Sequence, residues 1–264
     1  KIKYLFKKSL VRKADQWLSS GRYTTEFLVH YGAEENRIHF YPFSSVFEKD
    51  ILPAVPSADE KQALKEELGV PEKRMVLAIG QFIHRKGFDI LMHAACSLDK
   101  DVGIYIVGGE PTEDYLQMRA SLGLDNVHFV GFQKKEALSR YYRAADLFVL
   151  PTREDIWGLV INEAMAAGLP VISTDRCIAA LELIPGRGTC ENGKEDADAG
   201  MIVENENLGQ MKEALLTLIQ SPELREKLSE NAICRIQSYT IETMAAEHDR
   251  IFQKLSAERR ERRN

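Results

Sequence analysis

The feature that most constrains the fold of this chain is a regular alternation of apolar runs and helix-like segments from Lys73 onward. The apolar runs, rich in β-branched residues, stand at 75–79, 103–107, 126–130, 146–150, 170–174 and 200–203. Helical patterns follow them at 87–97, 111–122, 134–144, 157–167, 177–184 and 208–220. Strands joined by helices run parallel, and continuous apolar runs indicate strands buried on both faces. We therefore predict an α/β fold with a doubly wound, Rossmann-like parallel sheet, whose ligands bind beyond the carboxyl ends of the strands.

The rest of the chain predicts two further parts. Residues 1–52 contain two helix-like and two strand-like stretches, too little for a domain, and a two-proline linker follows at 48–61. The main domain is expected at 53–240, and a C-terminal helix at 241–264. Because residue 1 is Lys rather than Met, we expect the chain to be part of a longer polypeptide.

Charge and composition exclude several classes of protein. The net charge is −5, yet the first 13 residues hold six basic residues and no acid, and four arginines stand in the last seven, so the acids gather between the two ends. An acidic body argues against nucleic-acid binding. The longest apolar run is too short to span a bilayer, and no secretory signal opens the chain.

The cysteines bear on the compartment. The chain has no CxxC pair and no metal-ligand spacing among its four cysteines, which are Cys96, Cys177, Cys190 and Cys234. This usage favours reduced side chains and a cytoplasmic location, although Cys177 and Cys190 could bridge.

A carboxylate inside a predicted buried helix is the first candidate site residue. The stretch EDIWGLVINEAMAAGLPVIST (154–174) predicts a helix from about Trp157 to Ala167 that is apolar nearly all round, with Glu163 in its middle. Burying an unpartnered carboxylate costs several kcal/mol, as an order of magnitude, so Glu163 needs a partner. The cis hydroxyls of a ribose would satisfy it if the phosphates of a nucleotide sat over the helix start. A neighbouring Arg or backbone group is the structural alternative.

Two other loops follow predicted strands. Arg85 and Lys86 stand just before a helix, where cations oppose the helix dipole unless an anion binds between them and the helix amides. A solvated basic pair is the alternative, and Gly80 serves as a turn residue in that reading. The Gly108–Gly109 pair is better explained by a tight turn than by a phosphate. Asp155 is expected either to contact a ligand or to be the N-cap of the following helix.

These residues carry a resemblance to a known family. YYRAADLFVLPTREDIWGLVINEAMAAGLPVIST resembles the donor-domain motif of the retaining, two-domain GT-B glycosyltransferases of family 4, or group 1. Members carry an acid, seven residues and a second Glu, which are Asp155 and Glu163 here. GQFIHRKGFDIL resembles the phosphate loop of the family, and NVHFVGFQKKEALSRYYRAAD its base-binding loop and helix. The resemblance covers about residues 14–260.

The resemblance implies a role for each matching residue. Glu163 would bind the ribose hydroxyls, and Asp155 the hydroxyls of the donor sugar. Lys86, with Arg85 beside it, would hold the diphosphate together with the start of the helix. The loop around Gly131 and Phe132 would receive the base. The remaining expected donor contacts are Gly80, Gln81, Leu138, Trp157, Gly158 and Leu159.

Two residues depart from the pattern of the family. The first acid is usually Glu, and Asp155 is one methylene shorter; an Arg expected in the phosphate loop is Gln81. The resemblance also makes residues 1–52 the end of an acceptor-binding domain, most of which lies outside this chain, with the C-terminal helix crossing back toward it. Such a chain would bind the donor without necessarily catalysing the transfer of the sugar.

The expected reaction is transfer of a hexose-type sugar from a nucleoside-diphosphate sugar, with retention, to a glycan or lipid-linked acceptor. No metal or other cofactor is expected. The basic ends predict peripheral contact with an anionic membrane, or else only a solubilising helix and tail. The base, the sugar and the acceptor stay open.

Three alternatives belong to other classes. Asp196 and Asp198 form a D-x-D that in another glycosyltransferase fold binds a divalent metal, although a solvated acidic turn explains it better. A Rossmann dehydrogenase would need a G-x-G-x-x-G at the first helix of the sheet, and none stands there. A non-catalytic nucleotide-sugar-binding module is the third alternative.

Overall fold

The computed structural model describes residues 2–186, 188–189, 195–196 and 198–261, and it divides into two compact units. Residues 1–48 with 238–264 form one unit, and residues 49–237 form the other. The sequence placed the boundaries at 52/53 and 240/241. The function predicted for each part remains a prediction.

The larger unit is an α/β domain. Its strands are β3 (Arg74–Ile79), β4 (Val102–Val107), β5 (Val127–Val130), β6 (Leu147–Leu150), β7 (Val171–Thr174) and β10 (Gly200–Val203). Its helices are α3 (Ala58–Leu68), α4 (Phe88–Ala95), α5 (Glu113–Ser121), α6 (Lys135–Ala144), α7 (Leu159–Ala166), α8 (Ile178–Leu183), α9 (Leu208–Gln220) and α10 (Pro222–Ile236). Short turns of 3-10 helix stand at η2 (Glu48–Asp50) and η3 (His84–Lys86), and β8 (Gly188–Thr189) pairs with β9 (Glu195–Asp196).

Six of these strands form one parallel sheet in the order β10-β7-β6-β3-β4-β5. The chain moves outward from β3 to β4 and β5, then returns to the other side of β3 with β6, β7 and β10. The strand order therefore reverses between β3 and β6, and the carboxyl ends of these two strands mark the switch point at which such sheets bind ligands. The predicted Rossmann-like α/β fold is confirmed.

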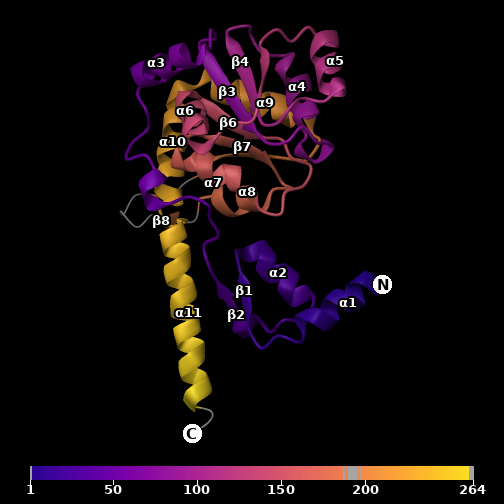
Figure 1. Ribbon diagram of the computed structural model, residues 1–264, viewed down its shortest axis with the longest axis vertical. Helices are drawn as coiled ribbons and strands as arrows, with labels where there is room; N and C mark the ends of the chain where they lie inside the picture. The colour runs from indigo at the N-terminus through magenta and orange to yellow at the C-terminus, as the bar shows by residue number, and fades with distance from the viewer. Residues whose placement is uncertain (1, 187, 190–194, 197, 262–264) are drawn as a thin grey trace. The chain divides into compact units, whose positions relative to one another are not determined.

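Helices cover the sheet on both faces, as Figure 1 shows. On one face, alternate strand residues such as Val76, Ile104 and Val149 share a core with α4, α5 and α9. Residues of the opposite parity point the other way. Phe148 of β6 lies 6.0 Å, between ring centroids, from Tyr142 of α6, which places α6 on the second face. Burial on both faces is the reason that the strands read as continuous apolar runs.

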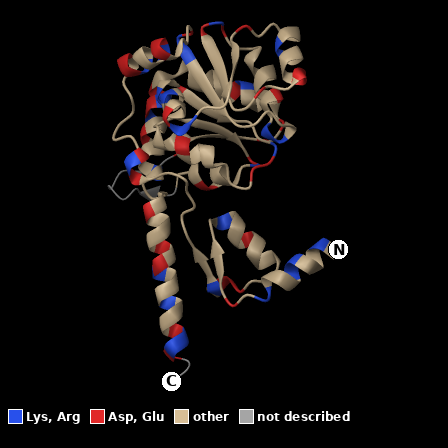
Figure 2. Ribbon diagram, viewed as in Figure 1, with Lys and Arg blue, Asp and Glu red and all other residues tan. Residues whose placement is uncertain are grey.

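The smaller unit contains α1 (Ile2–Val11), β1 (Trp17–Ser19), α2 (Arg22–His30), η1 (Glu35–Arg37), β2 (Ile38–Phe40) and α11 (Ile241–Glu261). β1 and β2 pair in parallel. The start of α11 is tied to this unit, because Ile241 donates its amide to the carbonyl of Val46 at 2.8 Å. The ring of His248 lies 4.5 Å from that of Tyr41. Figure 2 shows basic residues along α1 and both signs of charge along α11.

None of the described helices combines the length and the apolar composition needed to cross a membrane.

Candidate functional site

Most of the predicted site residues lie on two loops at the switch point of the sheet. The loop after β3 carries Gly80, Gln81, Arg85 and Lys86, and the loop after β6 leads through Asp155 to α7. The loops are packed without space between them: a Cβ atom on Gly87 would stand 1.9 Å from the carbonyl oxygen of Pro151. Only glycine fits there, and its φ of 68° also favours glycine.

Hydrogen bonds hold the same two loops together. The carbonyl of Arg85 accepts from the amide of Arg153 at 2.8 Å and from the hydroxyl of Thr152 at 2.9 Å. Thr152 is fully buried, and its own carbonyl accepts from the Thr174 hydroxyl at 2.6 Å. The backbone of the loop after β3 is thus fixed to the ends of β6 and β7.

The structure brings Lys86 and Asp155 into direct contact. The Lys86 Nζ atom lies 2.7 Å from Oδ2 of Asp155, and their side chains are only 14% and 13% exposed. Arg85 flanks the pair, with Nη1 at 4.0 Å from Oδ1 of Asp155 and a 3.0 Å hydrogen bond to the Glu154 carbonyl. Two predicted contacts for a diphosphate and one for a sugar therefore form a single charged cluster.

Asp155 is not the N-cap of α7, so that alternative was wrong. The helix begins at Leu159, two residues later than expected, and its N-cap is Gly158 in the left-handed conformation with φ 93°. Asp155 stands upstream in extended backbone that pairs in parallel with Cys177, and its amide donates to the Arg176 carbonyl at 2.9 Å.

The start of α7 is built by buried groups. Trp157 is 5% exposed, and its indole Nε1 donates to the side chain of Asn162 at 2.9 Å. The Cys177 thiol donates to the Trp157 carbonyl at 3.0 Å, and burial raises the pKa of that thiol to about 11. Beyond these anchors, the first amides of α7, near Gly158 and Leu159, have no acceptor within the helix. An anion is the natural acceptor for them.

Glu163 is half-buried rather than fully buried, and its partner is a tyrosine that sequence reasoning missed. The hydroxyl of Tyr142, on α6, donates to Oε2 of Glu163 at 2.8 Å. Tyr142 is 5% exposed. Burial raises the pKa of its hydroxyl well above the ordinary value, and the Glu163 carboxylate adds to this, so the hydroxyl stays protonated and donates. One oxygen of Glu163 is thereby oriented at the side of α7.

Ile156 stands just before the helix that was predicted from about Trp157. Its side chain is 83% exposed, although it follows Asp155 directly and precedes the buried Trp157, so it lies outside the core.

The expected base-binding residues lie at the carboxyl end of β5 and on α6. Phe132 is 80% exposed, Gly131 is exposed and Leu138 is half-buried. Among the described residues, no hydrogen bond or ion pair joins these three, or Gln81, to the Lys86–Asp155 cluster. They share the ligand-binding edge of the sheet with the cluster.

Arg153 is a second residue that sequence reasoning missed. Its guanidinium makes two hydrogen bonds to the Asp89 carboxylate, at 2.8 and 2.7 Å, and one to Glu206 at 2.7 Å. It also donates to the His84 carbonyl at 2.8 Å. Arg153 therefore joins the loop after β6 to the loop after β3, to α4 and to the loop after β10. Within one sequence, nothing distinguishes it from a solvated arginine in a charged loop.

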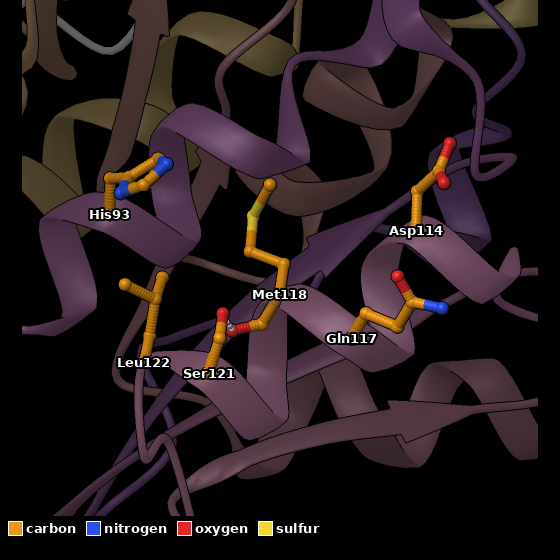
Figure 3. Close-up of a pocket in the computed structure, with 6 residues that line it drawn as sticks. All are labelled: His93, Asp114, Gln117, Met118, Ser121 and Leu122. Carbon is orange, nitrogen blue, oxygen red and sulfur yellow. Dashed lines mark hydrogen bonds between the residues drawn. The ribbon is translucent and has the colours of Figure 1, made fainter.

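A surface pocket between α4 and α5 lies apart from this site. His93, Asp114, Gln117, Met118, Ser121 and Leu122 line it, and Figure 3 shows their side chains. None of the predicted site residues is among them.

Within the described part of the chain, no group of three His, Cys, Asp or Glu residues could hold a metal ion. In the D-x-D motif, the Asp198 carboxylate accepts a hydrogen bond from the Gly186 amide at 2.8 Å. Ala197 and the side chain of Asp196 lie outside the described residues. Cys190 also lies outside the described residues, whereas Cys96 and Cys177 are free.

Comparison with known proteins decides the family. The sequence profile of the family "Glycosyl transferases group 1" matches residues 60–235. The chain belongs to this family. The match covers both loops of the candidate site and every strand of the large sheet.

Individual members of the group 1 family agree with this. The chain is 27% identical over 214 residues to the lipopolysaccharide glucosyltransferase WaaG of Escherichia coli, which covers 78% of this chain and 53% of WaaG. The chain spans about half the length of the curated relatives that it matches.

Solved structures share the GT-B type of fold. A sucrose-phosphate synthase from Thermosynechococcus elongatus matches with a TM-score of 0.78 and 24% identity, over 97% of this chain and 62% of that one. The Anabaena protein HepE, solved in complex with UDP-glucose, matches with a TM-score of 0.72 and 18% identity, over 95% of this chain and 68% of HepE.

Proposed function

We propose that this chain is the donor-binding part of a retaining glycosyltransferase of family 4, which moves a hexose-type sugar from a nucleoside-diphosphate sugar to a glycan or lipid-linked acceptor. The observation that carries the proposal is the cluster of Lys86, Arg85 and Asp155 beside the start of α7, at the switch point of a Rossmann-like sheet. Cations and helix amides suit a diphosphate, and a carboxylate suits sugar hydroxyls.

Each group has a distinct task in the proposed site. Lys86 and the first amides of α7 hold the diphosphate. Glu163, oriented by Tyr142, receives the ribose hydroxyls, and Asp155 receives hydroxyls of the sugar. The exposed ring of Phe132, with Gly131 and Leu138, provides the surface for the base.

The chemistry follows from the leaving group. Breaking the bond between sugar and phosphate adds negative charge to the diphosphate while the sugar becomes oxocarbenium-like. Lys86 and the helix start stabilise that developing charge electrostatically. The proposed retention proceeds by attack from the front side, with the leaving phosphate helping to take the proton of the acceptor. No covalent nucleophile and no metal is part of the proposal.

The lengths of the relatives support a second candidate. Because the chain spans about half of each curated relative, it would serve as a nucleotide-sugar-binding module if the acceptor side were supplied elsewhere or were absent. A turnover assay on the full-length protein separates the two candidates, since only the transferase releases nucleoside diphosphate in an acceptor-dependent way.

A thermal-shift screen of this chain against UDP, GDP and their sugars tests the donor site directly. A ligand at about 100 times its dissociation constant stabilises by ~2.7 kcal/mol, which raises the melting temperature of a domain of this size by roughly 5–10 °C. The same shift is expected in excess chelator. If none of these ligands moves the melting temperature at millimolar concentration, the chain is not a donor site for UDP-sugars or GDP-sugars.

A further inference from the structure

The acidic and basic residues of the donor site neutralise one another in the absence of ligand. Lys86 and Asp155 are 2.7 Å apart, and both side chains are largely buried. The nearest further cation, Arg85, also directs Nη1 toward Asp155, at 4.0 Å from Oδ1. A diphosphate that approaches Lys86 therefore meets a carboxylate already in place.

The backbone segments that carry the two partners are fixed by hydrogen bonds. The loop that carries Lys86 is bound through the Arg85 carbonyl to Thr152 and Arg153. Asp155 is fixed by its amide at Arg176 and by its carbonyl, which accepts from the Ile178 amide at 3.3 Å. A ligand must therefore accommodate the Asp155 carboxylate rather than displace the loop.

Two nucleotides meet this carboxylate differently. A terminal phosphate carries about −1.5 to −2 at pH 7, because its second pKa is near 6, whereas a phosphate esterified to a sugar has lost that second ionisation. The free diphosphate brings this extra negative charge close to Asp155, and it lacks the sugar hydroxyls that would donate hydrogen bonds to the carboxylate. The nucleotide sugar brings less charge, and its sugar hydroxyls donate to the carboxylate.

We propose that Asp155, held by Lys86, selects a sugar-bearing nucleotide over the free nucleoside diphosphate that the transfer reaction releases. This inference rests on the proposed donor site. It gives Asp155 a second task beyond contact with the sugar: once the sugar has left, the same carboxylate repels the remaining diphosphate and favours its release.

Calorimetric titration of Asp155→Asn tests the selection. The probes are whichever nucleoside diphosphate, UDP or GDP, the parent chain binds more tightly, and the corresponding nucleotide sugar. Asp155→Asn is expected to bind the free diphosphate about tenfold more tightly than the parent, because a charge within several ångströms is removed. It should bind the nucleotide sugar less tightly. The gain for the diphosphate should shrink as salt rises.

Two control variants isolate the charge at this position. Glu154→Gln removes the same charge from an exposed side chain one residue away and should leave the preference between the two ligands unchanged. Asp155→Glu keeps the charge and should show no gain for the free diphosphate. A melting curve of each variant without ligand identifies any that fails to fold; if Asp155→Asn does, Asp155→Ala, which removes the same charge, carries the comparison.

The outcomes distinguish this inference from the proposed function. If the parent chain binds neither UDP nor GDP, the donor site itself is wrong. If the parent binds one of them and Asp155→Asn binds it equally or more weakly, the carboxylate only positions Lys86, and the selection is refuted.

Discussion

The hydroxyl of Tyr142 donates to Oε2 of Glu163 at 2.8 Å, from one helix to the next across the buried edge of the site. The two residues stand 21 positions apart in the sequence. This contact answers the question that the half-buried carboxylate raises: Tyr142 supplies a hydrogen bond to it within the protein, and we propose that the same carboxylate also receives the ribose hydroxyls.

Replacing Tyr142 by Phe should destabilise the chain without a change in shape. Glu163 then loses a donor while remaining half-buried, which costs about 1–2 kcal/mol of unfolding free energy. Urea denaturation of the ligand-free chain measures the loss. Tyr141→Phe is the matched control, since its side chain is half-buried and makes no comparable bond to Glu163. Equal unfolding free energies for the two variants would contradict the role given to Tyr142.

Glu163→Gln separates ligand binding from folding. The amide oxygen of Gln still accepts from Tyr142, so stability should change little. A ribose bound to the carboxylate loses a charge-assisted hydrogen bond, worth roughly 1.5–3 kcal/mol or about 10- to 150-fold in affinity. The free diphosphate and the nucleotide sugar should weaken alike, because both contain the ribose. Titration that finds both ligands bound as tightly as by the parent would remove Glu163 from the site.

The sheet could be predicted from the sequence almost to the residue. Strands buried on both faces leave a continuous apolar run, and the run at 75–79 became β3 at Arg74–Ile79. The order of the strands could not be read in this way, because pairing in a parallel sheet depends on crossovers that leave no mark in a single strand.

The loops that carry the candidate site residues could be located in the sequence, but the contacts between these residues could not. Lys86 and Asp155 were assigned to different parts of a ligand, yet they bind one another across 69 residues. The helix start was misplaced because Gly158 looked like part of an apolar helix, whereas its left-handed φ makes it the N-cap. Tyr142 and Arg153 were missed because a tyrosine on a helix face and an arginine in a loop are ordinary in sequence and acquire their tasks only from tertiary neighbours.

Lys86→Ala should weaken diphosphate binding far more than nucleoside binding. The nucleoside has no phosphate for the ammonium group to hold, so it reports only the base and ribose contacts. The loss for the diphosphate should shrink as salt rises, since salt screens the interaction. Lys100→Ala, an exposed lysine in the turn before β4, removes the same charge elsewhere and should have little effect. Unchanged diphosphate affinity of Lys86→Ala would sink the assignment.

The basic ends of the chain predict binding to anionic vesicles. Helix α1 exposes Ile2, Leu5, Phe6 and Leu10 beside its lysines, although Lys7 also lies 5.1 Å from the centroid of the Phe27 ring. At the C-terminal end, Arg262 and Arg263 lie outside the described residues. Each basic residue near an anionic surface contributes about 1 kcal/mol, so losing Lys3 and Lys13 should reduce co-sedimentation roughly 30-fold.

The vesicle measurement compares the double variant Lys3→Ala, Lys13→Ala with Lys100→Ala, Lys227→Ala, which makes the same charge change on exposed residues of the larger unit. Anionic and neutral vesicles are used side by side. Binding of the parent chain that is no greater with anionic lipid would leave α1 as a solubilising basic helix.

The Arg153–Asp89 pair links stability to pH with a defined sign. Burial alone would raise the pKa of Asp89, but the hydrogen bonds and charge of Arg153 outweigh it and lower the pKa below the ordinary value of 3.8. A carboxylate whose pKa is lowered in the folded state contributes stability above its unfolded-state pKa, and this contribution is lost as pH falls through the folded-state pKa.

Asp89→Asn should therefore be less stable than the parent by about 1–2 kcal/mol at pH 7, and this difference in unfolding free energy should close below roughly pH 4. Urea denaturation across this range measures it, with Asp125→Asn, an exposed carboxylate before β5, as the control. A gap that stays constant down to pH 3 would mean that Asn disturbs packing rather than charge.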